Sequence, residues 1–446
     1  MTSGPLFKNI VIYTIPIILT GALQMLFNTA DLIVIGQFRG GDSVGAVGAT
    51  SSLTNLLTNF FIGFSVGSGV STAHAVGAGN KASTKRTVSS AMATALVCSV
   101  IVTLIGVFAS EPLLRMMDTP EEILDRSALY MKIYFSGALA VLVYNFGASI
   151  LRAVGETKKP LIYLSIAGVT NIVLNIVFVT LFHMDVEGVA LATILSQMLS
   201  AALVVRDLMT RQDSCKLVLK ELRFHKAETV KILALGIPTG IQSCVFSVSN
   251  VLIQSSVNGF GLAAVSGNSA ASSIENFTYI VMNSFQQTSM NFTGQNFGAG
   301  KIDRVKRIFV ICVFSVSAVG LVIGSLTYVF GRQLLGFYVG NDTAAIEAGM
   351  VKLFFVGLLY FLCGLMEVTT GTLRGMGTSL APMITAVCGV CVFRIGWNLT
   401  VFNLPQLHSL SGLFVSYPIS WVVTGMINLI VYCVLIRKLE KRSRVG

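Results

Sequence analysis

The ten residues LRAVGETKKP at 151–160 return further along the chain as LRGMGTSLAP at 373–382. Both copies open with Leu-Arg, place Gly at the fifth position and close on Pro, at a separation of about 222 residues. Two more pairs recur at almost the same separation, namely Ile15-Pro16 with Ile237-Pro238 and Gly77-Ala78-Gly79 with Gly298-Ala299-Gly300. Several matches in one register indicate an internal duplication. We therefore predict a chain built from two homologous halves.

The composition predicts that lipid surrounds most of the chain. Of its 446 residues, 54% are hydrophobic and 11% are charged, whereas soluble domains carry about 25% charged residues. The apolar residues fall into blocks of about 20 or more, the length that a helix needs to cross a bilayer. We place twelve such spans at 10–36, 45–73, 88–110, 128–151, 160–182, 187–208, 230–257, 263–290, 306–330, 348–371, 381–403 and 411–436. The predicted fold class is an all-α integral membrane protein with twelve transmembrane helices in two pseudo-symmetric six-helix lobes.

Each predicted half holds an even number of spans, so both halves begin and end on the same side of the membrane. Halves of this kind are related by an axis along the membrane normal, which is the parallel repeat of transporters. We assign an N-terminal lobe to residues 1–208, a charged linker to 209–229 and a C-terminal lobe to 230–446. In this architecture we expect the substrate site between the lobes, with the helix prolines Pro16 and Pro238 in structural or gating roles.

The positive net charge is explained by topology and needs no nucleic acid partner. The chain carries 31 Lys and Arg against 20 Asp and Glu, a net charge of +11. Most of the basic residues fall in connections on one side, above all in the linker and the C-terminal tail, and such a bias marks the cytoplasmic face. We therefore expect a multi-pass protein of the plasma membrane with both termini in the cytoplasm. Arg152 and Arg374 end spans on this side, where we expect roles in topology and gating.

No catalytic motif occurs in the sequence. It contains neither a Walker phosphate loop nor an H-E-x-x-H metal motif, and its four histidines are far apart. No cytoplasmic segment is large enough for a nucleotide-binding domain, which excludes an ATP-driven pump made of this chain alone. A secondary transporter of small molecules, without a cofactor and driven by an ion gradient, remains.

Away from the ends of the predicted spans, only three acidic residues fall inside them, namely Asp31, Glu275 and Glu367. An ionisable side chain in the membrane is costly and is therefore a functional candidate. Asp31 shares one helix face with Gln24 and Asn28 at the spacing i, i+4, i+7. The alternative is a polar seam between packed helices. We favour function, because packing alone rarely uses a carboxyl group.

Span eight carries a second polar face, formed by Glu275, Tyr279, Met282 and Gln286. Aromatic and methionine side chains beside a carboxylate suit an organic cation, through cation–π contacts and adaptable packing. We assign these four residues to a substrate cavity, together with Gln24, Asn28 and Asn55. The alternative is that the aromatic and methionine side chains only fill the space between helices.

Glu367 in span ten has two possible roles. It either lines the same cavity or forms a buried pair with Arg394, which we identify as the only basic residue deep in a span. A buried pair would hold the second lobe together.

As a set, these features resemble the multidrug and toxic compound extrusion (MATE) family over essentially the whole chain. The L-R-x-x-G sequence occurs in both halves, Gly-Ala-Gly follows spans two and eight, and the segment QNFGAG at 295–300 is similar to the cytoplasmic turn of the family. The resemblance implies an exporter of drugs and other organic cations that is driven by the inward flow of sodium ions or protons.

The resemblance also implies an ion site in the first lobe, at Asp31, Asn171, Asn175 and Thr193. Asn171 and Asn175 are one helical turn apart, and carboxylate, amide and hydroxyl oxygens are ligands that a small cation such as sodium prefers. Many members carry Asp where this chain has Asn175, so one negative charge is missing. One branch of the family carries a Glu in span seven where this chain has Phe246. The second lobe must then draw any acid from Glu275 or Glu367.

Two other classes compete with this interpretation. A lipid-linked saccharide flippase of the same superfamily would carry several deep basic residues, where we identify Arg394 alone. A membrane receptor or scaffold that transports nothing would need neither a buried acid on a polar stripe nor two symmetric lobes. We expect the transporter to act as a monomer in the lipid bilayer.

Overall fold

The computed structural model describes residues 1–117 and 119–445. Contacts within the chain divide it into two compact units. The N-terminal unit is Ile15–Cys244, and the C-terminal unit is Met1–Thr14 together with Val245–Gly446. The division falls inside two long helices, α1 (Leu6–Arg39) and α8 (Lys226–Asn258), whereas the sequence-based lobes meet at the linker.

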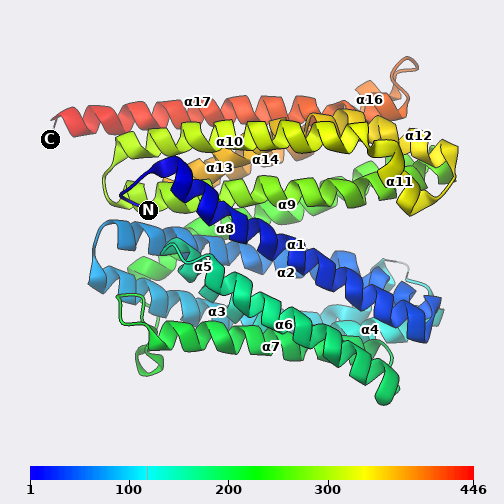
Figure 1. Cartoon of the computed structure of the whole chain (residues 1–446), viewed down its shortest axis with the longest axis horizontal. Helices are drawn as coiled ribbons and strands as arrows, with labels where there is room; N and C mark the ends of the chain where they lie inside the picture. The colour runs from blue at the N-terminus through cyan, green and yellow to red at the C-terminus, as the bar shows by residue number, and fades with distance from the viewer. Residues whose placement is uncertain (118, 446) are drawn as a thin grey trace. The chain divides into compact units, whose positions relative to one another are not determined.

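The N-terminal unit is helical, and its core lies where α2, α3 and α5 run side by side (Figure 1). Large apolar side chains such as Phe135, Phe146 and Ile150 are fully buried there. Close packing of α5 on α7 depends on Gly147, because a Cβ atom at this position would lie 2.2 Å from Cγ1 of Val204. Besides parts of α1 and α8, the unit contains α2 (Gly41–Gly77), α3 (Lys81–Met116), α4 (Glu121–Ser136), α5 (Ala138–Ala153), α6 (Lys158–Ile176), the π-helical turn η1 (Val177–Leu181), α7 (Val186–Thr210) and the short 3₁₀ turn η2 (Leu219–Glu221).

In the C-terminal unit α9 packs along α13, with glycines at the contact. A Cβ atom at Gly371 would lie 2.4 Å from the backbone oxygen of Gln286, so only glycine fits. The elements are α9 (Leu262–Gly298), α10 (Ile302–Val329), α11 (Gly331–Val339), α12 (Thr343–Lys352), η3 (Leu353–Leu358), α13 (Tyr360–Gly375), α14 (Leu380–Ala386), η4 (Val387–Val392), α15 (Phe393–Leu399), η5 (Val401–Asn403), α16 (Leu410–Phe414) and α17 (Ser416–Val445). Of these, η3 and η4 are π-helical and η5 is a 3₁₀ turn.

The prediction of a twelve-helix membrane protein is confirmed. Among the described residues, ten helical segments are long and apolar enough to cross a membrane, and α4 with α5, which meet at a 47° bend, make an eleventh. The twelfth is α9, which has 37 residues but carries many Asn, Gln, Ser and Thr side chains. Span four was predicted as one helix and is in fact this bent pair, broken at Gly137.

The duplication is visible in backbone geometry as well as in sequence. Positive φ angles occur at matched glycines: Gly79 with Gly300 at 67° and 69°, and Gly155 with Gly377 at 101° and 87°. Residues with a side chain rarely adopt such angles, so glycine is needed at each of these tight turns. The turn of the L-R-x-x-G sequence therefore has the same backbone form in both units.

Candidate functional site

Asp31 lies on α1, where it meets three polar side chains from two other helices of the N-terminal unit. Asn175 of α6 donates its side-chain N–H to Asp31 Oδ1, and Thr193 of α7 donates its hydroxyl to Asp31 Oδ2 at 3.4 Å. Asn171, one turn before Asn175, accepts an N–H from Asn175 at 3.4 Å and donates to Thr193 Oγ1 at 3.5 Å. The four residues predicted as an ion site thus form one hydrogen-bonded group, which we call the Asp31 group.

The end of α1 is fixed on the π-helical turn that follows Asn175. A π turn leaves backbone carbonyl groups without their usual helical partners. Arg39, about two turns beyond Asp31, donates Nη2–H to the carbonyl of Val179 at 2.8 Å and Nε–H to that of Met184 at 2.9 Å. These bonds tie α1 to η1 and so hold Asp31 beside Asn175.

The oxygen atoms of the Asp31 group suit a small cation. Asn175 is fully buried, and its Oδ1 has no hydrogen-bond partner in the described part of the chain. An unsatisfied buried oxygen costs about 1–3 kcal/mol, which a bound cation would offset. With the Asp31 carboxylate, Asn171 Oδ1 and Thr193 Oγ1 it forms a set of hard oxygen donors. These ligands suit a sodium ion, and the Asp31 carboxylate can instead bind a proton.

The other polar residues predicted in this half do not belong to the Asp31 group. Gln24 and Asn28 are exposed on α1, and Asn55 is exposed on α2. Exposure alone does not distinguish an amide that binds a ligand from one that packs against another helix. Their place in a substrate cavity remains a prediction.

In the C-terminal unit Glu275 forms an ion pair that the sequence did not predict. Lys352 Nζ, at the end of α12, lies 3.1 Å from Glu275 Oε2 and donates to Ser272 Oγ at 2.5 Å. Tyr360 donates its hydroxyl to Glu275 Oε1 at 3.2 Å. Lys352 is 5% exposed. The expectation that Arg394 is the only deep basic residue is therefore wrong, because Lys352 is buried as well.

The predicted face of α9 divides into exposed and buried members. Tyr279 is 42% exposed, whereas Met282 is fully buried with its sulfur atom against Gly364. Gln286 is buried and donates its side-chain N–H to Glu367 Oε2. For Met282 this burial agrees with the alternative interpretation, packing between helices.

Glu367 has other neighbours than the predicted Arg394. Besides its bond from Gln286, it interacts electrostatically with Arg374, which is 5% exposed at the end of α13. No ion pair joins Glu367 to Arg394 among the described residues; Arg394 instead donates Nε–H to Ser420 Oγ at 2.9 Å. The two residues lie on different helices, α13 and α15, whose rotation the sequence does not reveal.

The residues predicted for gating lie inside long helices and at helix ends. Pro16 is inside α1 and Pro238 is inside α8. Beside Pro238, α8 approaches α2 so closely that a Cβ atom at Gly236 would lie 2.6 Å from the Cα atom of Phe64. Arg152 lies in the last turn of α5, as Arg374 does in α13. Arg374 is 5% exposed, and the expected roles of the two arginines in topology and gating stay predictions.

The linker before α8 is anchored on the start of α3. Ser89 Oγ donates to the backbone oxygen of Glu221 at 2.9 Å and accepts the N–H of Arg223 at 3.0 Å. Arg86 pairs with Glu228 at 2.9 Å. We call these contacts the linker anchor. They lie wholly within the N-terminal unit.

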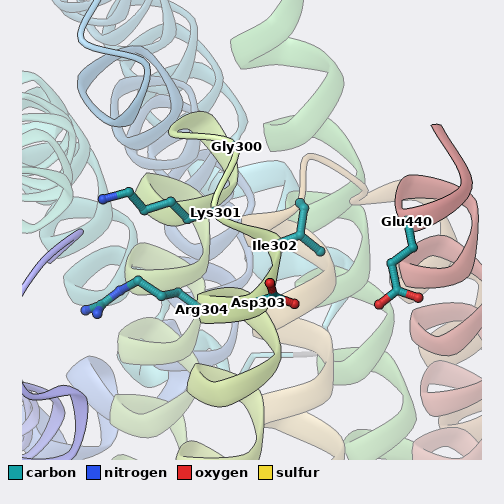
Figure 2. Close-up of a pocket in the computed structure, with 6 residues that line it drawn as sticks. All are labelled: Gly300, Lys301, Ile302, Asp303, Arg304 and Glu440. Carbon is teal, nitrogen blue, oxygen red and sulfur yellow. The ribbon is translucent and has the colours of Figure 1, made fainter. Parts of the chain in front are cut away.

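The segment before α1 is held in a matching way in the C-terminal unit. Lys301 donates to the backbone oxygen of Thr2 at 3.0 Å, and Arg304 donates to that of Gly4 at 3.3 Å. Beside it lies a surface pocket of about 350 Å³, lined by Gly300, Lys301, Ile302, Asp303, Arg304 and Glu440. In Figure 2 the two cations point to one side and the carboxylates of Asp303 and Glu440 to the other. None of the predicted site residues lines this pocket.

Comparison with known proteins gives one consistent family. The MatE family model matches residues 16–177 and 238–400. The probable multidrug resistance protein YpnP of Bacillus subtilis is 29% identical over 395 residues, which cover 88% of each chain. The multidrug export protein MepA of Staphylococcus aureus (strain NCTC 8325) is 20% identical, over 92% of this chain and 89% of its own.

Solved structures give the same fold. A crystal structure described as MATE in the bent conformation superposes with a TM-score of 0.92 at 20% identity, and the match covers 99% of this chain and 98% of the other. The outward-facing conformation of a multidrug resistance MATE family transporter of the MOP superfamily superposes with a TM-score of 0.91 at 20% identity, over 98% and 97% of the two chains.

Proposed function

The chain belongs to the MatE family of multidrug efflux transporters, and we propose that it is an antiporter that exports hydrophobic, often cationic, organic compounds in exchange for sodium ions or protons. It is a transporter and not an enzyme, and its apolar spans make it a multi-pass membrane protein. We propose alternating access as the route, with the duplicated lobes 1–208 and 230–446 joined by the linker 209–229.

The Asp31 group is the observation that supports ion coupling. Coupling requires a site that binds its ion differently in two conformations. A single carboxylate, half-buried among Asn171, Asn175 and Thr193, gains a bound cation or a proton as its charge partner. Because the group draws on α1, α6 and α7, a shift of α1 along the other two would separate Asp31 from its ligands and release the ion.

The positive charge of the linker and the tail supports the proposed orientation. We propose residence in the plasma membrane with both termini in the cytoplasm, following the positive-inside rule. We further propose that the monomer is the working unit, since each chain carries both lobes.

The decisive experiment is efflux of a cationic dye such as ethidium from proteoliposomes. A sodium gradient and a proton gradient are imposed in separate runs, and we expect accelerated efflux under one of them. Asp42→Asn is the matched control, because Asp42 is an exposed acid just beyond α1 and should leave the rate unchanged. Efflux that ignores both gradients would refute the antiporter.

A further inference from the structure

The C-terminal unit buries more positive than negative charge. Five of its described charged side chains are buried or half-buried in the helical interior, namely Glu275, Lys352, Glu367, Arg374 and Arg394. Lys352 pairs with Glu275 at 3.1 Å, and Glu367 interacts electrostatically with Arg374. Arg394 has no acidic partner, since no carboxylate of the described residues lies within ion-pair distance of it. Glu275, the acid of the same region, is already paired with Lys352.

Aromatic rings cannot supply the missing negative charge. The Arg394 guanidinium lies 3.9 Å from the ring centre of Tyr417 and 5.7 Å from that of Trp421, and the side chain is 5% exposed. Cation–π contacts are worth about 2 kcal/mol when desolvated. Burying an ion costs several kcal/mol even after relaxation. The stack orients the guanidinium but leaves its charge uncompensated.

The surplus charge belongs to one continuous cluster. Tyr360, which holds Glu275, packs on Trp421 with ring centres 5.2 Å apart, and Trp421 in turn faces Arg394. Lys352 lies 5.9 Å from the ring centre of Phe414. Two cations and one carboxylate therefore share one aromatic enclosure with a net charge of +1. One monovalent anion would neutralise it.

We propose that Arg394 is the centre of a binding site for a small monovalent anion such as chloride. Within the described part of the chain, only the Nε–H of its five N–H donors has a side-chain acceptor, which is Ser420 Oγ. Stacking on the Tyr417 ring fixes the orientation of the remaining N–H donors, which are the ones available to an anion. The enclosing rings are themselves buried, Trp421 to 4% exposure and Tyr360 to 4%. Rings this deeply buried favour a small halide over a bulky organic anion.

Trp421 makes the proposal measurable, since the chain contains two tryptophans. In a Trp397→Phe variant all tryptophan fluorescence comes from Trp421, beside Arg394. Titration with bromide, at constant ionic strength maintained with gluconate, should quench this fluorescence along a saturating curve. Chloride should reverse the quenching by competition. A weak, linear quenching that chloride does not reverse would overturn the proposal.

Charge-specific variants separate a bound anion from general attraction. Arg394→Gln in the same background should lose the saturating phase, while Arg394→Lys should retain it with several-fold weaker affinity. Arg332→Gln removes an exposed base paired with Glu347 and should change nothing. If Arg394→Gln does not fold, the test is made on the unaltered protein through its melting temperature. Its melting temperature must be higher in sodium chloride than in sodium gluconate, and equal values would refute the site. Neither measurement involves transport, so the outcome is independent of the proposed function.

Discussion

Equivalent helices of the two units adjoin or carry charged side chains of opposite sign. In the N-terminal unit the acid Asp31 is bound by α6 and α7. By the repeat of about 222 residues, these helices correspond to α14–η4–α15 and to α16–α17, which carry Arg394 and its partners Tyr417 and Ser420. The position equivalent to Arg394 is Ile172, next to Asn171. The same place in the duplicated frame therefore adjoins an acidic side chain in one unit and holds a basic one in the other.

The frame itself is shared much more closely than the charges. The turn glycines match in φ, and the segments before α8 and α1 are hydrogen-bonded to the starts of α3 and α10, respectively. Backbone turns tolerate few residue types, whereas a buried charge needs only some partner of opposite sign. The duplication has thus preserved the geometry and allowed the chemistry of the two centres to diverge.

The largest effect is expected at the acidic centre. Asp31→Asn should abolish gradient-driven efflux, because an amide neither takes up a proton nor neutralises a cation. Folding should not suffer, since the change removes a charge from a half-buried place and keeps the size of the side chain. Vesicle efflux measures the first effect and thermal unfolding in detergent the second. Efflux at the rate of the unaltered protein would contradict this role of Asp31 and indicate that coupling depends on the C-terminal unit.

The next largest effect tests the charge balance of the C-terminal unit. Lys352→Met leaves Glu275 buried without its cation, and breaking such a pair costs about 3–5 kcal/mol. Glu275→Gln should destabilise less, because Lys352 keeps Ser272 Oγ as an acceptor at 2.5 Å. The double variant should recover most of the loss. Denaturation in detergent measures all three, and additive losses would show that the two side chains do not form a stabilising pair.

The sequence predicts the frame well because its signals are local. Span lengths, the repeat and the i, i+4 pair Asn171 and Asn175 all depend on spacing along one helix. The resemblance to a family then placed Asp31 and Thr193 beside them, and the structure brings all four together.

Pairings between side chains of different helices could not be predicted from the sequence. Glu275 meets Lys352, and Arg394 meets Tyr417, only because α9, α12, α15 and α17 are rotated so that these faces coincide. Hydrophobic spacing does not encode that rotation when helices are apolar on every side. One signal was nonetheless present: Lys352 lies five residues inside the predicted span 348–371, where a lysine is unusual.

A smaller effect is expected from placing a second acid in the Asp31 group. Asn175→Asp adds a second carboxylate beside Asp31, and two like charges at this distance cannot both stay ionised without a cation. If sodium is the coupling ion, its half-saturating concentration should fall about tenfold, equivalent to about 1.4 kcal/mol. Sodium-dependent efflux at several concentrations measures the shift. A change in pH dependence alone would indicate that the site carries protons.

The smallest effect concerns the linker anchor, for which Cys215 is a natural probe. This thiol is 1% exposed, and burial raises the pKa of Cys215 to about 12. Ser89→Ala removes the hydroxyl that holds Glu221 and Arg223. Losing a hydrogen bond of about 1 kcal/mol should increase opening of the linker about fivefold. Maleimide labelling of Cys215, located by peptide mass spectrometry at pH 8, should accelerate by that factor.

The pH dependence shows whether labelling passes through the open linker. A raised pKa means that the docked linker disfavours the thiolate, while in the open form Cys215 titrates near 8.5, the usual value for a thiol. Between about pH 8.5 and 12 the open form binds fewer protons, so rising pH favours opening in that window. Labelling through the open form should therefore keep increasing about tenfold per pH unit beyond pH 8.5, whereas labelling of a thiol that is always open would level off there. Lys301→Gln loosens the matching anchor of the C-terminal unit and should leave the rate at Cys215 unchanged. If it accelerated labelling, the two anchors would be coupled, and the units could not be treated as independently anchored bodies.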